Sequence, residues 1–255
     1  MNDAHLPLLR MKGVGKSFAN GVVALDGLDL DVRAGEFLSL LGPSGCGKST
    51  ALRMIAGLSR QTSGGIAWRN GVMPQVGFVF QEPTLMPWAD VAHNVYLPLR
   101  LSGVSEREAE PRIRTALEGV GLAQFAQAYP RELSGGMRMR VSIARALVTR
   151  PPLLLMDEPF AALDEISRFK LNDDLLALAR GLKTTVVFVT HSVFESVYLS
   201  SRIAVFSARP GRVVQTIEVD GPAVRDAEFR LSPQFAESCR RASAALDRAS
   251  GRVLA

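Results

Sequence analysis

The fold of this chain is decided by one stretch, Gly42-Pro43-Ser44-Gly45-Cys46-Gly47-Lys48-Ser49-Thr50. It fits the pattern GxxxxGK(S/T) of a phosphate-binding loop. The apolar run before it, residues 36–41, predicts a buried strand, and residues 49–56 after it predict a helix that ends before Gly57. A tight turn before an ordinary helix is the alternative, but strand, glycine-rich loop and helix follow one another in the order that phosphate binding requires.

Each kind of residue in this loop has a chemical reason to be there. The glycines let backbone N–H groups close around a phosphate, and the helix N-terminus adds its partial positive charge. We expect the Lys48 ammonium to reach the β- and γ-phosphates of a nucleotide, and the Ser49 hydroxyl to bind Mg²⁺. The stretch therefore predicts a site for a nucleotide and magnesium.

Length and charge narrow the class of protein. With 255 residues, 47% of them apolar, the chain can form one large domain or a domain with an added lobe. The net charge of +5 is spread in clusters of at most two or three basic residues, which does not favour nucleic-acid binding but suits an anionic lipid surface or a membrane partner. The two cysteines, Cys46 and Cys239, do not make a disulfide framework, which fits the reducing cytosol.

Targeting and membrane segments are not predicted. Residues 1–10 include an aspartate, a histidine and a proline, and no apolar core of a signal peptide follows them. No run approaches the roughly 18–20 apolar residues of a membrane span. We therefore expect any membrane role to come through a partner.

Residues 8–32 carry short alternating apolar stretches between glycines and predict a small antiparallel sheet. Further on, Gly64-Gly65 and Asn70-Gly71 predict turns. The first stretch contains Phe18, which either packs in the core or stacks on a nucleotide base. The sequence leaves both interpretations open.

A strand is expected at residues 76–80, and Gln81 follows it. The carboxyl end of a strand in a nucleotide-binding α/β sheet is where ligands bind, so Gln81 either contacts magnesium or water, or is a solvated strand end. The loop Leu85-Met86-Pro87-Trp88 is apolar and stiffened by proline. It is either an exposed partner contact or a loop folded into the core.

Residues 91–148 have helical periodicity. A capping box at residues 105–108 predicts a helix start, while Pro111 predicts either a kink or a later start. Ser134-Gly135-Gly136 precede a helix with apolar residues at spacings of four, three and four. Glycines at a helix N-terminus leave N–H groups directed outward, so this is either a second anion site or an ordinary N-cap.

The run Leu153-Leu154-Leu155-Met156-Asp157-Glu158 predicts a buried parallel strand that ends in two acids. Side chains alternate along a strand, so the two carboxylates cannot have the same role. Asp157 suits the magnesium side of a phosphate-loop NTPase, and Glu158 suits a base that activates water. His191 follows another predicted strand, residues 184–190, where a phosphate contact is the better interpretation.

Residues 202–219 predict two short strands around the turn at 209–212. Residues 221–255 predict a helical tail, too short for a second folded domain.

Together these motifs resemble the ATP-binding cassette (ABC) ATPases. The decisive match is Leu133-Ser134-Gly135-Gly136-Met137, which is similar to the LSGGQ signature of that family. The phosphate loop, the signature, the strand with Asp157 and Glu158, and then His191 occur in the family's order. The resemblance covers about residues 8–220.

The resemblance implies an α/β fold: a phosphate-loop NTPase (RecA-like) core with an N-terminal antiparallel β subdomain and an inserted α-helical subdomain at about residues 90–148. The ABC ATPase domain would occupy residues 1–220 and the helical tail residues 221–255.

The resemblance also implies residue roles for binding and hydrolysing ATP with Mg²⁺. Lys48, Glu158, His191 and Gln81 would be catalytic, with Glu158 the base and His191 the switch histidine. Ser49, Gln81 and Asp157 would hold the metal. Phe18 would stack on adenine, and the phosphate loop, the signature residues Ser134, Gly135 and Gly136, and Asp164 of the D-loop would contact ATP.

Partners follow from the same resemblance. Two cassettes would sandwich two ATP molecules head to tail, so that Ser134–Gly136 of one copy close the phosphate loop of a second. The chain would lie on the cytoplasmic face of the membrane, bound to two integral permease subunits, with an external solute-binding protein supplying the solute. Nucleic acid is not an expected partner.

Further motifs resemble the nitrate, sulfonate and taurine importer subgroup, with related pyrimidine-precursor and riboflavin importers. These are residues 81–88, 160–165 and Ser207-Ala208-Arg209-Pro210-Gly211-Arg212. Three positions depart from the family pattern: Met137 and Met139 replace glutamines, and Ala161 replaces a serine. No catalytic carboxylate is lost, so hydrolysis should survive.

A soluble ABC ATPase that acts on ribosomes or DNA is the alternative. Translation-type members usually carry two cassettes in one chain. Repair types insert long coiled coils between the phosphate loop and the signature, whereas Lys48 and Ser134 are only 86 positions apart (134 − 48). An exporter is disfavoured by the subgroup motifs.

Overall fold

The structure is a computed structural model that describes residues 7–161, 163–222 and 224–251. Ala162 of the predicted D-loop, and Ala223 and the last four residues of the predicted tail, lie outside that description. Two compact units are present, the first made of residues 1–73 and 185–255, the second of residues 74–184. Among the described residues, no helix is both long and apolar enough to cross a membrane.

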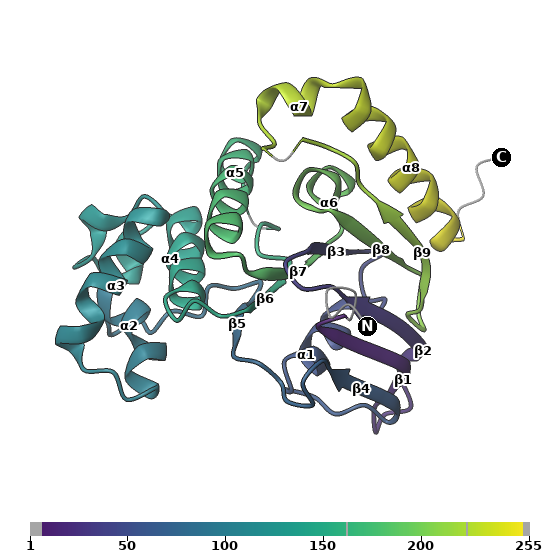
Figure 1. The fold of residues 1–255 in the computed structure, drawn as a ribbon, viewed down its shortest axis with the longest axis horizontal. Coiled ribbons are helices and arrows are strands. Elements are labelled where there is room, and N and C mark those ends of the chain that lie inside the picture. Colours follow the sequence, from purple (N-terminus) through teal and green to yellow (C-terminus); the bar gives the residue numbers. More distant parts are fainter. Residues whose placement is uncertain (1–6, 162, 223, 252–255) are drawn as a thin grey trace. The chain divides into compact units, whose positions relative to one another are not determined.

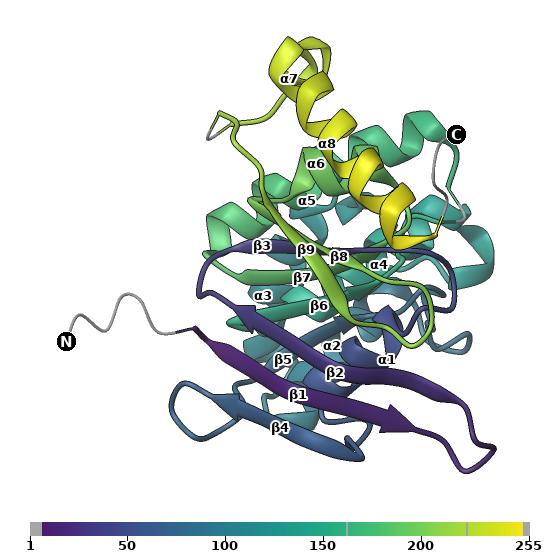
Figure 2. The ribbon, with the colours of Figure 1, turned by 90° about the vertical axis from the view of Figure 1, so that its right-hand side faces the viewer.

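The first unit contains a three-stranded antiparallel sheet (Figure 2). Its strands are β1 (Leu9–Ser17), β2 (Val23–Val32) and β4 (Ser63–Trp68), in the order β2-β1-β4. In β1 and β2 buried and exposed residues largely alternate, as in a sheet with one face on the core. The sequence-based prediction of an antiparallel sheet at residues 8–32 is therefore confirmed.

The turn predicted at Gly64-Gly65 is wrong, because both glycines lie inside β4. Gly64 has φ +75°, and a Cβ atom there would lie 2.3 Å from the carbonyl oxygen of Gly13 on β1. The glycine allows close approach of two strands rather than a reversal of the chain. The turn predicted at Asn70-Gly71 is confirmed, with Gly71 N–H bonded to Trp68 O.

The same unit holds a set of mainly parallel strands. β3 (Phe37–Leu41) pairs in parallel with β7 (Thr185–Thr190) and with β8 (Arg202–Phe206), and β9 (Val213–Glu218) is antiparallel to β8. Every residue of β3, β7 and β8 is buried. Continuous burial explains why these strands are apolar runs and not alternating patterns.

The described part of the first unit also contains four helices, which are labelled in Figure 1. They are α1 (Lys48–Ile55), α6 (Val193–Leu199), α7 (Ala227–Leu231) and α8 (Pro233–Ala249). The predicted helical tail is thus α7 and α8, and α8 packs on α6 and β8. Phe229 and Phe235 from the tail make edge-on contact with each other, and Phe235 also meets Tyr198 of α6 edge-on.

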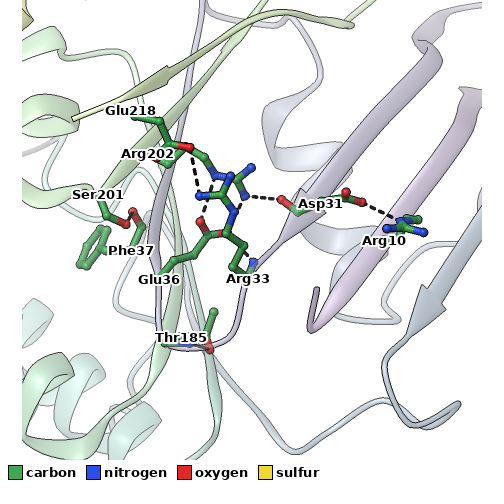
Figure 3. A network of polar contacts seen from close by, with 10 residues as sticks. Arg10, Asp31, Arg33, Glu36, Phe37, Thr185, Ser201, Arg202 and Glu218 are labelled. Carbon is green, nitrogen blue, oxygen red and sulfur yellow. Dashed lines mark hydrogen bonds and ion pairs between the residues drawn. The ribbon is translucent and has the colours of Figure 1, made fainter. Parts of the chain in front are cut away.

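A buried ion pair joins three strands of this unit (Figure 3). Arg202, at the start of β8, donates from Nε to Glu36 Oε2 at 2.9 Å and from Nη2 to Glu36 Oε1 at 2.6 Å. Arg202 also donates to Asp31 O, and Glu36 accepts from the Arg33 backbone N–H. The pair therefore ties the end of β2 to the starts of β3 and β8.

The second unit contains two parallel strands, β5 (Val76–Val79) and β6 (Leu153–Asp157), with Val79 opposite Met156. Helix α4 (Gly135–Leu147) packs on β5 and on α2 (Val91–Leu101) and α3 (Glu106–Gly119). The long helix α5 (Glu165–Leu182) follows β6. Short 3₁₀ turns occupy Ala123–Phe125 and Pro130–Glu132.

Helix α3 begins at the predicted capping box. Ser105 is the N-cap, and Glu108 reaches back to both its backbone N–H and its hydroxyl. Pro111 lies within the helix, so the helix does not start later than the box.

Candidate nucleotide site

The loop between β3 and α1 is shaped by its glycines. Gly45 and Gly47 have φ of +73° and +104°, a region that residues with a side chain rarely adopt. A Cβ atom on Gly47 would lie 2.7 Å from Ala24 O, and one on Gly42 would lie 2.9 Å from the Cβ of Phe206. The glycines are therefore required both by the backbone conformation and by close neighbours.

Lys48 is held inside this loop. The residue is only 3% exposed, and its Nζ donates to Gly42 O at 2.7 Å and to Pro43 O at 2.9 Å. The ammonium lies against the carbonyls of the loop at the first turn of α1, where an anion would find both the charge of Lys48 and the partial positive charge of the helix N-terminus. Burial raises the pKa of the neighbouring Cys46 thiol, so that side chain adds no negative charge at neutral pH.

Phe18 is not a core residue. It is 44% exposed, and Lys16 Nζ lies 5.3 Å from the centroid of its ring. The core interpretation is therefore wrong, and an accessible aromatic face next to β1 remains. Stacking on a nucleotide base stays a prediction.

His191 is an exposed residue between β7 and α6. Ser192 caps α6, with its side chain accepting from Glu195 N–H, and Ser192 N–H donates to Thr190 Oγ1 at 3.0 Å. The histidine is thus fixed between the end of a buried strand and a capped helix. Its contact with a phosphate stays a prediction.

In the second unit, three predicted site residues follow neighbouring parallel strands. Asp157 ends β6 and is 5% exposed, Glu158 comes next with φ +45° and is half-buried, and Gln81 follows β5 and is exposed. Because Val79 pairs with Met156, Gln81 and Glu158 are each two residues past a paired position at the same edge. The arrangement gives two carboxylates of different burial, which agrees with different roles.

These side chains offer oxygen ligands of the kind that Mg²⁺ prefers. The hydroxyl of Ser49 in the first unit, and the carboxylate of Asp157 and the amide of Gln81 in the second, are each hard oxygen donors. Among the described residues there is no group of three His, Cys, Asp or Glu side chains that could hold a metal.

The signature residues form the N-terminus of α4. Ser134 is the N-cap and accepts from Met137 N–H at 3.2 Å, while Ser134 and Gly135 are exposed. A Cβ atom on Gly135 or Gly136 would come no closer than 4.0 or 3.8 Å to its nearest neighbour. The packing of this chain therefore does not require glycine at either position.

Asp164 is the N-cap of α5 and accepts from Ser167 N–H at 2.9 Å. Hydrogen bonds from Ser167, chiefly from its side chain, lower the pKa of the Asp164 carboxyl below its ordinary value. The carboxylate is therefore charged at neutral pH.

Trp88 is 76% exposed, so the interpretation of its loop as core is wrong for this side chain. The loop is held by Asn94, a fully buried residue of α2. Its Oδ1 accepts from Met86 N–H, and its Nδ2 donates to Met86 O and to Ala89 O. Next to Trp88 lies a groove of about 310 Å³, with walls formed mainly by Met86, Trp88, His93, Tyr96, Arg100 and Tyr129.

Sequence reasoning missed two arginines that contact these loops. Arg145 of α4 donates to Pro83 O and Thr84 O, and Arg209 donates to Gly45 O. Both contacts join distant parts of the chain, so no local pattern could have revealed them. The motif at residues 207–212 includes Arg209 but does not indicate its contact with Gly45 O.

A glycine-rich phosphate cradle with a buried lysine and a strand that ends in two carboxylates define the class of phosphate-loop nucleotide-binding proteins. Comparison with known proteins identifies the family within that class. Residues 25–161 match the ABC transporter family. The chain belongs to that family and is an ABC transporter ATPase, which confirms the sequence-based prediction of family, fold and enzyme class.

Similar proteins cover most of the chain. The aliphatic sulfonates import ATP-binding protein SsuB 1 of Pseudomonas syringae pv. syringae is 46% identical over 213 residues, 83% of this chain and 85% of that protein. The ABC transporter ATP-binding protein MJ0412 of Methanocaldococcus jannaschii is 45% identical over 236 residues, 90% of this chain and 87% of its own length.

Solved structures agree with the fold. The dimeric ATP-binding cassette MJ0796 in a post-hydrolysis state with ADP and Pi superposes with a TM-score of 0.73 at 33% identity, covering 84% of this chain and all of that one. The cassette cbiO1 from Clostridium perfringens, part of the transporter complex cbiONQ, has a TM-score of 0.75 at 27% identity, over 84% of this chain and 89% of that one.

Proposed function

We propose that this chain is the ATP-hydrolysing subunit of an ABC import system, with the solute passing through separate membrane subunits. The observation that carries the proposal is the presence in one chain of a glycine-shaped phosphate loop that holds Lys48 and of a buried strand that ends in Asp157, with Glu158 directly after it. Similarity to the sulfonate import protein supports the direction of transport and makes an aliphatic sulfonate the first solute to test.

In this proposal each residue has its own role in binding or hydrolysing ATP. The loop N–H groups and Lys48 bind the phosphates, and Phe18 stacks on adenine. Asp157, Ser49 and Gln81 would hold Mg²⁺, which would supply positive charge to the phosphates. Glu158 accepts a proton from the attacking water, and His191 contacts the γ-phosphate.

We further propose that a second copy completes each site. The glycines at 135 and 136 are not needed by the chain's own packing, and they leave the N-terminus of α4 accessible. A γ-phosphate bound to the partner copy would meet these N–H groups and the Ser134 hydroxyl. The dimeric cassette MJ0796 supports this assembly.

The groove next to Trp88 is the proposed contact for a permease subunit. Trp88 is exposed, and its loop is held by the hydrogen bonds of Asn94 to Met86. A partner would therefore contact a large apolar side chain whose loop loses little conformational entropy on binding. Trp88→Ala should reduce transport in membranes while the ATPase activity of the isolated chain is kept.

The decisive experiment is Glu158→Gln. Without the base, ATP and Mg²⁺ still bind but hydrolysis stops, so the variant with ATP should form a stable dimer by light scattering. The exposed Glu118→Gln on α3 is the matched control and should hydrolyse ATP like the wild type. A Glu158→Gln variant that stays monomeric with saturating ATP would refute the dimer, and one that hydrolyses ATP normally would refute the role of Glu158.

A further inference from the structure

The turn between β8 and β9, residues 207–212, packs directly on the phosphate loop. Gly211 is buried, and a Cβ atom there would lie 2.1 Å from Cys46 O. Its N–H donates to Ala24 O at 2.9 Å, and its carbonyl accepts from Asp26 N–H at 3.4 Å. The backbone of the turn therefore lies between β2 and the phosphate loop, at a distance that only glycine permits.

From this turn the side chain of Arg209 reaches the tip of the loop. Nε lies 3.1 Å and Nη2 2.9 Å from the carbonyl oxygen of Gly45. Two donors of one planar guanidinium thus converge on a single acceptor. Gly45 is exposed and has φ +73°, so its peptide would otherwise be among the least restrained in the loop.

Fixing the Gly45 carbonyl also fixes the next N–H group. In a planar trans peptide the C=O and the N–H point in opposite directions, so the orientation of Gly45 O determines that of Cys46 N–H. In this structure Cys46 N–H makes a long hydrogen bond within the loop, to Pro43 O at 3.4 Å. Backbone N–H groups are what such loops use to bind phosphate. The guanidinium also adds a positive charge beside the loop.

We propose that Arg209 is a positioning residue for the phosphate loop: by holding Gly45 O it presets the loop N–H groups and raises nucleotide affinity. The inference rests on the proposed role of residues 42–49 in binding ATP. It adds a residue 164 positions away in the sequence to the determinants of that affinity.

Arg212 in the same turn is the matched control. It pairs with Asp26 through side chains that are more than half exposed, and does not contact the phosphate loop by any bond the structure describes. Arg212→Ala removes the same charge from the same turn while its backbone bond to Ser207 Oγ stays.

The test measures binding of ATP and ADP with Mg²⁺ to the full chain by titration calorimetry, and ATPase rates against ATP concentration. Because Arg209→Ala loses a charge-assisted hydrogen bond, we expect its Kd for ATP to rise about tenfold or more. KM for ATP should rise in parallel, while kcat at saturating ATP and the melting temperature without nucleotide stay close to wild type. Arg209→Lys, which keeps one donor and the charge, should restore part of the affinity.

Unchanged affinity in Arg209→Ala would overturn the proposal. An equal loss in Arg212→Ala would also overturn it, because the effect would then belong to net charge. If Arg209→Ala does not fold, the same binding measurement is made on Arg209→Gln. Wild-type ATP affinity in Arg209→Gln would then overturn the proposal. A wild-type chain that does not bind ATP would instead refute the proposed function, whatever the Arg209 variants do.

Discussion

Arg145 of helix α4 is bonded to Thr84 at two atoms: Nη1 lies 2.9 Å from Thr84 O, and Nη2 lies 3.1 Å from Thr84 Oγ1. Nη2 also donates to Pro83 O at 2.9 Å. Thr84 has φ +47°, which is unfavourable for a β-branched residue. The helix that begins at Ser134 is thus tied to the loop that begins at Gln81.

Replacing Arg145 by alanine should release this loop. We expect the free energy of unfolding to fall by about 2 kcal/mol, because three bonds from a charged donor are lost and the one to Pro83 O is partly buried. The loop should also become more mobile, since Thr84 loses the contacts that hold its strained conformation. Fluorescence anisotropy of Trp88, measured in a Trp68→Phe background, should fall.

The exposed Arg114→Ala on α3 is the control for loss of a positive charge in the same unit. Equal anisotropy in both variants would show that Arg145 does not restrain the loop.

The contacts of Arg145 mark the limit of what the sequence could predict. The phosphate loop, the capping box at Ser105 and the strand ending in Asp157 depend on residues close together in the chain, so their patterns are local. The bonds from Arg145 to Thr84 and from Arg209 to Gly45 span 61 and 164 positions. Such contacts depend on how elements pack, which periodicity does not describe.

The error at Gly64 has the same origin. Two consecutive glycines favour a turn when only neighbours are considered. In the structure Gly64 is needed because another strand passes within contact distance, and that strand is 51 positions earlier (64 − 13). Phe18 and Trp88 were left open for a related reason, since exposure depends on the surrounding fold.

Gly64→Ala should destabilise the antiparallel sheet. The new Cβ would lie 2.3 Å from Gly13 O, and the left-handed backbone adds strain of its own. We expect the free energy of unfolding in urea to fall by about 2–4 kcal/mol. Gly65→Ala is a close control, because nothing lies within 4 Å of its Cβ position and its φ is not positive. Equal stability of the two variants would contradict the close-approach argument.

Arg225 should stabilise helix α6 from its C-terminal end. Its Nη1 donates to Val197 O, Tyr198 O and Ser200 O at 3.0, 2.8 and 2.8 Å, and its guanidinium lies 5.3 Å from the Phe229 ring centroid. A cation at helix carbonyls is favourable, so Arg225→Ala should lower the free energy of unfolding by about 2–3 kcal/mol.

Amide hydrogen exchange gives the local readout for Arg225. Exchange should accelerate in α6, which begins two residues after His191, and in α7. Arg241→Ala, an exposed position on α8, should leave both stability and exchange unchanged. Normal protection of the α6 amides in Arg225→Ala would show that Arg225 does not stabilise this helix.

The thiols should react slowly at neutral pH. Burial raises the pKa of Cys239 to about 11, above the ordinary value of 9.0. The protonated thiol therefore persists to higher pH in the folded chain, and its thiolate fraction at pH 8 is about 100-fold lower than in the unfolded chain. In a Cys46→Ser variant, alkylation by iodoacetamide should slow by that factor on folding and keep rising up to about pH 11. A plateau near pH 9 would contradict the raised pKa.

The ion pair of Glu36 and Arg202 should be costly to break on one side only. Their side chains are 7% and 8% exposed, and removing one partner leaves an uncompensated charge away from water. Glu36→Gln and Arg202→Met should each lower the free energy of unfolding by about 3–5 kcal/mol, whereas the double variant should recover much of that loss. The exposed ion pair of Lys12 and Asp29 is the control. Lys12→Ala should lower the free energy of unfolding by less than about 1 kcal/mol. Additive losses in the double variant would show that the two side chains act independently, and would remove the ion pair as the link between β2, β3 and β8.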